Sequence, residues 1–89
     1  MNIIYFIDNP QLYGSEIHLL DIVRYMKKIH NSKVITFQDG PLLNHFKEFN
    51  VEYEIIPTAY IPQKGSLSII KKSILDFKTD LIHAHPPGS

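Results

Sequence analysis

Two short segments carry residue types and spacings that could do chemistry. Gly14-Ser15-Glu16 follows a turn-prone stretch and opens a stretch of helical periodicity. A helix N-terminus presents N–H groups and partial positive charge, which favours phosphate or a polarised hydroxyl, and a glycine there lets a ligand approach the backbone. His83 and His85 end an apolar stretch and share a face if that stretch is a strand. An imidazole at a strand end can bond a hydroxyl or move a proton near neutral pH.

Each of these residues also has a simpler structural explanation. Gly14 alone is consistent with an ordinary turn, and Glu16 with a favourable charge in the first helical turn. His83, in mid-strand, fits a hydrogen-bonded core residue, whereas His85, at the strand's exit, is favoured as functional. A zinc site built from His83 and His85 would need His18 as its third ligand, and the position of His18 is unproven, so we expect no metal.

The elements that must position these residues alternate between strand and helix. Residues 2–7 are apolar almost throughout, which is typical of a strand covered on both faces. We expect further strands at residues 33–37, 52–56 and 81–85. The predicted helices run from residue 15 to about 29, from Pro41 at the first helical position to a terminator at Asn50, and from a cap at Ser66 to about residue 77.

The helices are predicted from apolar residues at helical spacing. The predicted stripes are Leu19, Ile22, Val23, Met26 and Ile29 in the first helix, Leu42, Leu43, Phe46 and Phe49 in the second, and Leu67, Ile70, Ile74 and Phe77 in the third. The order β-α-β-α-β-α-β with short connections predicts an α/β fold: a three-layer Rossmann-like domain with a parallel sheet of about four strands, order 3-2-1-4, and helices on both faces. Ligands of such sheets bind at the carboxyl ends of the strands, here between strands one and four.

Composition and missing motifs exclude several classes. Nine Lys plus Arg balance nine Asp plus Glu among 89 residues, so we expect no nucleic-acid partner. The chain has no cysteine, and its apolar stretches are far shorter than the roughly 20 residues of a membrane span. We expect a soluble, cytoplasmic domain. The sequence contains no G-x-G-x-x-G, P-loop or nucleophile-elbow motif, so no cofactor is expected. Asp8 fits a loop-shaping turn better than a phosphoacceptor.

The ordered set of motifs resembles a family. Three motifs occur in the order and spacing of the N-terminal Rossmann-like half of GT-B-type retaining glycosyltransferases, similar to family 4 or group 1. They are Gly-Ser-Glu before an amphipathic helix, Asp39-Gly40-Pro41-Leu42 after the second strand, and Asp80-Leu81-Ile82-His83-Ala84-His85. The resemblance implies transfer of a sugar from a nucleotide-sugar donor to a glycan, lipid-linked or small-molecule acceptor, without a metal. By position, it makes Gly14, Ser15 and Glu16 substrate-binding residues, and His85 and His83 catalytic residues.

In this family a second, donor-binding domain follows the first. The resemblance therefore implies that residues 1–89 are a partial N-terminal domain of a cytoplasmic enzyme, with a peripheral position at the inner membrane as an option. Alone, this segment should be inactive and should self-associate through the exposed edge of its fourth strand. The alternative is a non-catalytic α/β module that binds a small anion or a protein partner, and the reading frame beyond Ser89 would discriminate between the two.

Overall fold

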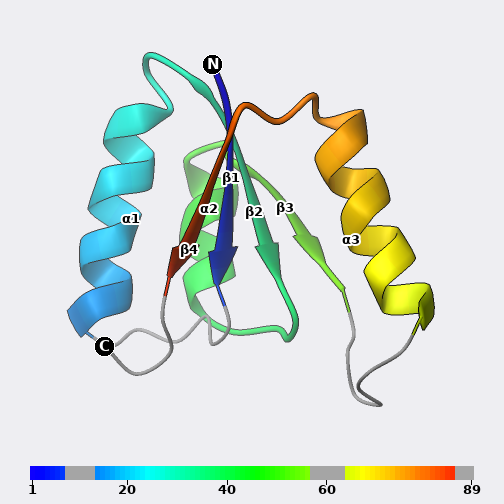
Figure 1. Ribbon diagram of the computed structural model, residues 1–89. Coiled ribbons are helices and arrows are strands. Elements are labelled where there is room, and N and C mark those ends of the chain that lie inside the picture. The colour runs from blue at the N-terminus through cyan, green and yellow to red at the C-terminus, as the bar shows by residue number, and fades with distance from the viewer. Residues whose placement is uncertain (8–13, 57–63, 86–89) are drawn as a thin grey trace.

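The computed structural model describes residues 1–7, 14–56 and 64–85. In that part of the chain a parallel sheet carries helices on both faces (Figure 1). The elements are β1 (Asn2–Ile7), α1 (Gly14–Met26), β2 (Asn31–Thr36), α2 (Leu42–Glu48), β3 (Glu52–Ile55), α3 (Lys64–Asp76) and β4 (Leu81–His85). The strand order is β3-β2-β1-β4 and every neighbouring pair is parallel. The predicted α/β Rossmann-like fold and its strand order are confirmed.

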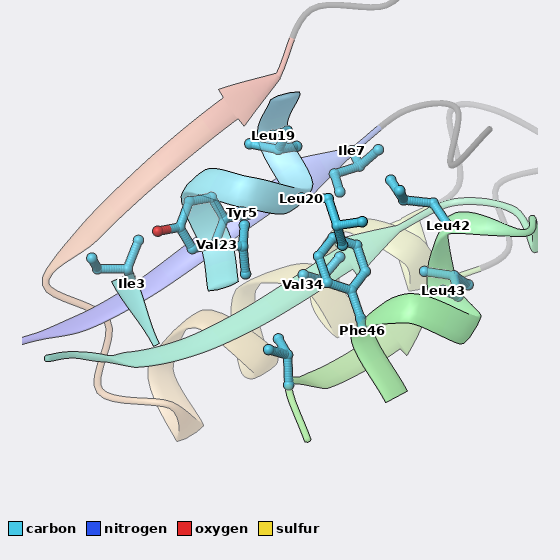
Figure 2. Close-up of a cluster of buried hydrophobic side chains, with 11 residues drawn as sticks. Ile3, Tyr5, Ile7, Leu19, Leu20, Val23, Val34, Leu42, Leu43 and Phe46 are labelled. Atoms are coloured by element: carbon cyan, nitrogen blue, oxygen red, sulfur yellow. The ribbon is translucent and has the colours of Figure 1, made fainter. Parts of the chain in front are cut away.

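The main core lies between the sheet and the two helices α1 and α2 (Figure 2). Alternation along β1 sends Ile3, Tyr5 and Ile7 to this face, because successive side chains of a strand point to opposite sides. The buried residues of this cluster are Ile3, Tyr5, Ile7, Leu19, Leu20, Val23, Val34, Leu42, Leu43, Phe46 and Val51. This core holds the first turn of α1 at the carboxyl edge of the sheet.

The opposite face is covered by α3 and is packed less completely. Its fully buried residues are Ile4, Ile35 and Ile56, against which Phe6, Phe37, Ile70, Ile74 and Phe77 pack while staying partly exposed. The stripe predicted for the third helix thus meets the sheet at Ile70, Ile74 and Phe77. The side chain of Leu67 lies outside the described residues.

The first helix is shorter than predicted. It ends at Met26, and backbone N–H groups of residues 28–30 close turns onto the carbonyls of Tyr25 and Met26 at 2.8 to 3.1 Å, so that β2 starts at Asn31 rather than at residue 33. The predicted stripe is wrong at two positions: Ile22 and Ile29 are exposed, whereas Leu20 is buried. The apolar spacing in the sequence extends past the end of the helix, because the turn that reverses the chain happens to continue it.

The end of α2 is where Asn50 was expected to stop it. Asn50 has a positive φ of 58°, its N–H donates to the Lys47 carbonyl at 3.1 Å, and the N–H of Val51 donates to the Phe46 carbonyl at 2.9 Å. This is a Schellman motif, with the Phe46 and Val51 side chains in the same core. At the other end, Pro41 is the N-cap rather than the first helical residue, so α2 starts one residue later than predicted.

The third helix starts at Lys64, so the predicted cap at Ser66 is wrong and this residue lies in the first turn. Apolar spacing sets the face of a helix but not the position of its first turn. The helix ends in a second Schellman motif, in which Lys78 takes a φ of 52° and the N–H groups of Lys78 and Thr79 donate to the carbonyls of Leu75 and Ile74.

Asn2 ties the end of α3 to the sheet. Its side-chain Nδ2 donates to the carbonyls of Phe77 at 2.8 Å and Lys78 at 3.1 Å, and its Oδ1 accepts a bond from Asn31 Nδ2 at 2.9 Å. Its backbone N–H donates to Asp80 Oδ2 at 2.7 Å, while its carbonyl accepts the N–H of Asp80 at 2.8 Å. One side chain therefore connects β1, β2 and the turn before β4.

Candidate functional site

The candidate site lies at the carboxyl edge of the sheet, where β1 and β4 end side by side. Ile7 is the register partner of His85, and Tyr5 is the partner of His83. The first turn of α1 lies at this same edge (Figure 1), because the helix runs back along the sheet from the end of β1. The structure thus brings the backbones of the two predicted segments to one edge. The side chains of Ser15 and His85 lie outside the described residues.

Gly14 is the first residue of α1 and is exposed. A Cβ built at this position would meet no atom within 4 Å, and its φ lies outside the left-handed region. Neither packing against described residues nor backbone strain therefore calls for a glycine here. The open backbone is what a ligand would need to approach the N–H groups of a helix start.

Glu16 lies on the inner side of α1. Glu16 is only 1% exposed. Leu19, Leu20 and Val23, which follow it by three, four and seven residues, lie on the same face of the helix. Glu16 lies in the first turn of α1, where its charge favours the helix dipole, but its burial goes beyond what that role needs. Burial places this carboxylate between the helix start and the sheet.

His83 is an exposed residue on the edge strand. Its ring lies 5.6 Å from the ring of buried Tyr5 at 55°, and it makes no hydrogen bond to a described residue. The expectation of a hydrogen-bonded core histidine is therefore wrong, because β4 has a neighbour on one side only within the described sheet. Burial raises the pKa of the Tyr5 phenol above its usual 10.0.

Thr36 belongs to the same edge and was not predicted there. It is the last residue of β2 and the register partner of Ile7, it is fully buried, and its Oγ1 donates to the Gln38 carbonyl at 3.3 Å. The signal in the sequence is a polar residue that closes an apolar strand.

The strongest electrostatic cluster lies elsewhere, on the α3 face. Lys33 Nζ contacts Glu52 Oε2 at 3.3 Å and Glu54 Oε1 at 3.1 Å, and Ser73 Oγ donates to Glu54 Oε1 at 2.7 Å. Burial alone would lower the pKa of Lys33, but the bonds and charges of the two glutamates outweigh it and raise this pKa above 10.5. Burial would raise the pKa of Glu54, yet the bonds from Ser73 and Lys33 hold it below 4.5.

This cluster joins β2, β3 and α3, so its role is structural. Sequence reasoning missed it, although Glu52 and Glu54 share one face of a strand that was predicted beside the strand of Lys33. Among the described side chains no three His, Asp or Glu residues could hold a metal ion together, and His18 is exposed. No helix in residues 14–56 and 64–85 is long and apolar enough to cross a membrane.

Comparison with known structures gives an informative likeness. No protein-family model and no curated protein matches this sequence. The crystal structure of Anabaena Alr3699/HepE in complex with UDP and glucose matches with a TM-score of 0.73 and 22% sequence identity. The match covers 97% of this chain and 23% of that chain. It shows that the fold is shared, and that this chain spans about a quarter of the length of its structural neighbour.

Proposed function

We propose that this chain is the first part of the N-terminal, acceptor-side domain of a GT-B-type retaining glycosyltransferase. The observation that carries the proposal is the fold shared over 97% of the chain with a protein whose structure contains UDP and glucose. The proposed reaction moves a sugar from a nucleotide-sugar donor to a glycan, lipid-linked or small-molecule acceptor. We place the enzyme in the cytoplasm, with a peripheral position at the inner membrane.

The carboxyl edge of the sheet supplies the proposed roles. The backbone N–H groups at Gly14 and Ser15 help neutralise charge on the departing phosphate. His85, at the end of β4, orients the transferred sugar or bonds the acceptor hydroxyl, and His83 lines the same wall from mid-strand. The buried carboxylate of Glu16 shapes the polar environment beneath the helix start.

The test is transfer from UDP-glucose and a panel of other nucleotide-sugars by the full-length protein that carries this chain. His85→Ala should lower turnover by about 10²-fold if the imidazole acts in the transition state. His45→Ala on α2 is the matched control and should leave turnover within about twofold. Wild-type kinetics in the His85 variant would remove the catalytic assignment. Failure of every donor to bind would favour the non-catalytic module.

Gly14→Ala separates binding from folding. The added methyl group meets open space, so the melting temperature should be unchanged or slightly higher, as expected for Gly to Ala in a helix. A donor phosphate that approaches the helix start closely would meet this methyl group, so KM for the donor should rise. An unchanged KM would mean that no ligand group approaches position 14.

A further inference from the structure

A basic hollow lies at the other end of α1, away from the candidate site. It has a volume of about 350 Å³ and is lined by Arg24, Lys27, Lys28 and Phe49. The three cations come from the last turn of α1 and the residues after it, and Phe49 is the C-cap of α2. The volume is at the lower end of the range of small-ligand pockets, which begins at about 300 Å³.

The three cations have no acidic partner among the described residues. No carboxylate among the described residues lies within ion-pair distance of Arg24, Lys27 or Lys28. The Arg24 guanidinium instead lies 5.0 Å from the centre of the Phe49 ring, and Lys27 Nζ donates to the Phe49 carbonyl. The ring and the carbonyl group of Phe49 thus hold two cations in place. Neither group carries a net charge, so no described residue compensates the positive charge of Arg24 and Lys27.

Basic residues near a helix C-terminus often serve only to bond the last carbonyl groups. In α1 three of the last four carbonyls are already occupied. The carbonyls of Val23, Tyr25 and Met26 accept the backbone N–H groups of residues 27–30. The side chain of Lys28 makes no hydrogen bond or ion pair with any described residue. Lys27 caps α2 through the Phe49 carbonyl, whereas Arg24 and Lys28 cap no helix among the described residues.

A second hollow adjoins the first. It has a volume of about 240 Å³, shares Lys27 and Lys28, and is also lined by His30 and Asn31. The Nδ1 atom of His30 is buried and has no hydrogen-bond partner among the described residues. The two hollows together provide one planar guanidinium and two ammonium groups, and His30 lines the second hollow.

We propose that this hollow binds a phosphate group. A planar guanidinium presents paired donors to a tetrahedral oxyanion, and two ammonium groups balance the second charge of a phosphate monoester, which a carboxylate lacks. The phosphate comes either from a free metabolite or from a lipid whose headgroup is itself a phosphate monoester, since both offer the same chemistry. The inference does not depend on glycosyl transfer, because the site lies at the opposite edge of the sheet.

The test is an NMR titration of the chain with inorganic phosphate at constant ionic strength. Saturating shifts should be confined to residues 24–30 and 49. Lys27→Gln/Lys28→Gln should weaken binding by at least about tenfold, because two of three cations are removed. Lys71→Gln/Lys72→Gln on α3 makes the same charge change with exposed lysines and should stay within about twofold. Lys28→Gln alone keeps the hydrogen bond from Lys27 to the Phe49 carbonyl, so weaker binding by this variant would not come from loss of folding.

Binding to vesicles of phosphatidic acid and phosphatidylcholine identifies the source. Vesicle binding that Lys27→Gln/Lys28→Gln abolishes and Lys71→Gln/Lys72→Gln spares would show a headgroup, even if free phosphate binds weakly. Saturation by inorganic phosphate with no vesicle binding would show a free ligand. Equal losses in the two double variants, or no specific shifts and no vesicle binding, would overturn the proposal.

Discussion

In the described part of the chain, eleven hydrophobic side chains are buried on the sheet face under α1 and α2, whereas three are buried under α3. The first face is held mainly by close packing of apolar side chains. On the second face a polar cluster of Lys33, Glu54 and Ser73 connects the helix to the strands. The difference shows that the two faces of one sheet can hold their helices in different ways, one mainly by apolar packing and one with the help of a charged cluster.

Removing one large side chain from each face should show the largest difference. Phe46 is fully buried under α2, so Phe46→Ala should lower the free energy of unfolding by about 3–5 kcal/mol. Phe77, which is only partly buried on the α3 face, should cost about half as much when changed to alanine. Urea unfolding of both variants measures the two costs. Equal losses would mean that the two faces are packed equally well.

The edge strand β4 offers the next largest effect. We expect the isolated chain to lack transferase activity and to associate through this edge, where Leu81 is 50% and Ile82 is 47% exposed. Ile82→Lys should weaken self-association by at least about tenfold, because an edge lysine opposes strand pairing. Ile69→Lys on α3 replaces an isoleucine that is 46% exposed and serves as the control. Sedimentation of a wild-type monomer at high micromolar concentration would contradict the prediction.

The polar cluster on the α3 face predicts a pH window. The pKa of Glu54 is below 4.5 in the folded chain, so its contribution is present above that value and is lost as pH falls through the folded pKa. The pKa of Lys33 is above 10.5, so its contribution is present below that value and is lost as pH rises through the folded pKa.

Ser73→Ala tests this window. Loss of its bond to Glu54 should cost about 1 kcal/mol near neutral pH and should flatten the acid limb of the stability curve. The alkaline limb, which follows Lys33, should stay as it was. Thermal unfolding measured across pH gives both limbs, and an unchanged acid limb would show that the Ser73 bond does not lower the pKa of Glu54.

The smallest effect is a gain in stability at the end of α3. Lys78 has a left-handed conformation that costs a non-glycine residue about 1–2 kcal/mol. Glycine removes this cost but has more entropy in the unfolded chain, so Lys78→Gly should stabilise the chain by about 0.5–1 kcal/mol. Asn50→Gly should gain less, because asparagine tolerates this conformation better. Chemical unfolding of the two variants tests the order.

The sequence was informative where local pattern and topology agree. The apolar run of β1 and the alternating order of elements predicted the sheet, and Asn50 marked the end of α2. The run of helical spacing to Ile29 misled because a turn can continue an apolar period by chance. At the candidate site, backbone positions such as that of Gly14 follow from strand order, whereas the burial of Glu16 depends on how α1 docks.

Features made by contacts between elements were not predictable in the same way. The cluster of Lys33 with Glu52 and Glu54 needs the register of β2 against β3, which no local pattern contains. The basic hollow needs α2 to place Phe49 beside α1, and the zero net charge of the whole chain concealed it.

The bonds of Asn2 have a consequence for the order of events in folding. They join residues separated by 75 to 78 positions in the chain. Closing so long a loop carries an entropy cost that local helices avoid, so such contacts form late. During synthesis β1 and β2 can pair before β4 has been made, and until then β1 is itself an open edge. A chaperone that shields this strand would therefore act before residue 85 emerges and would have no target afterwards.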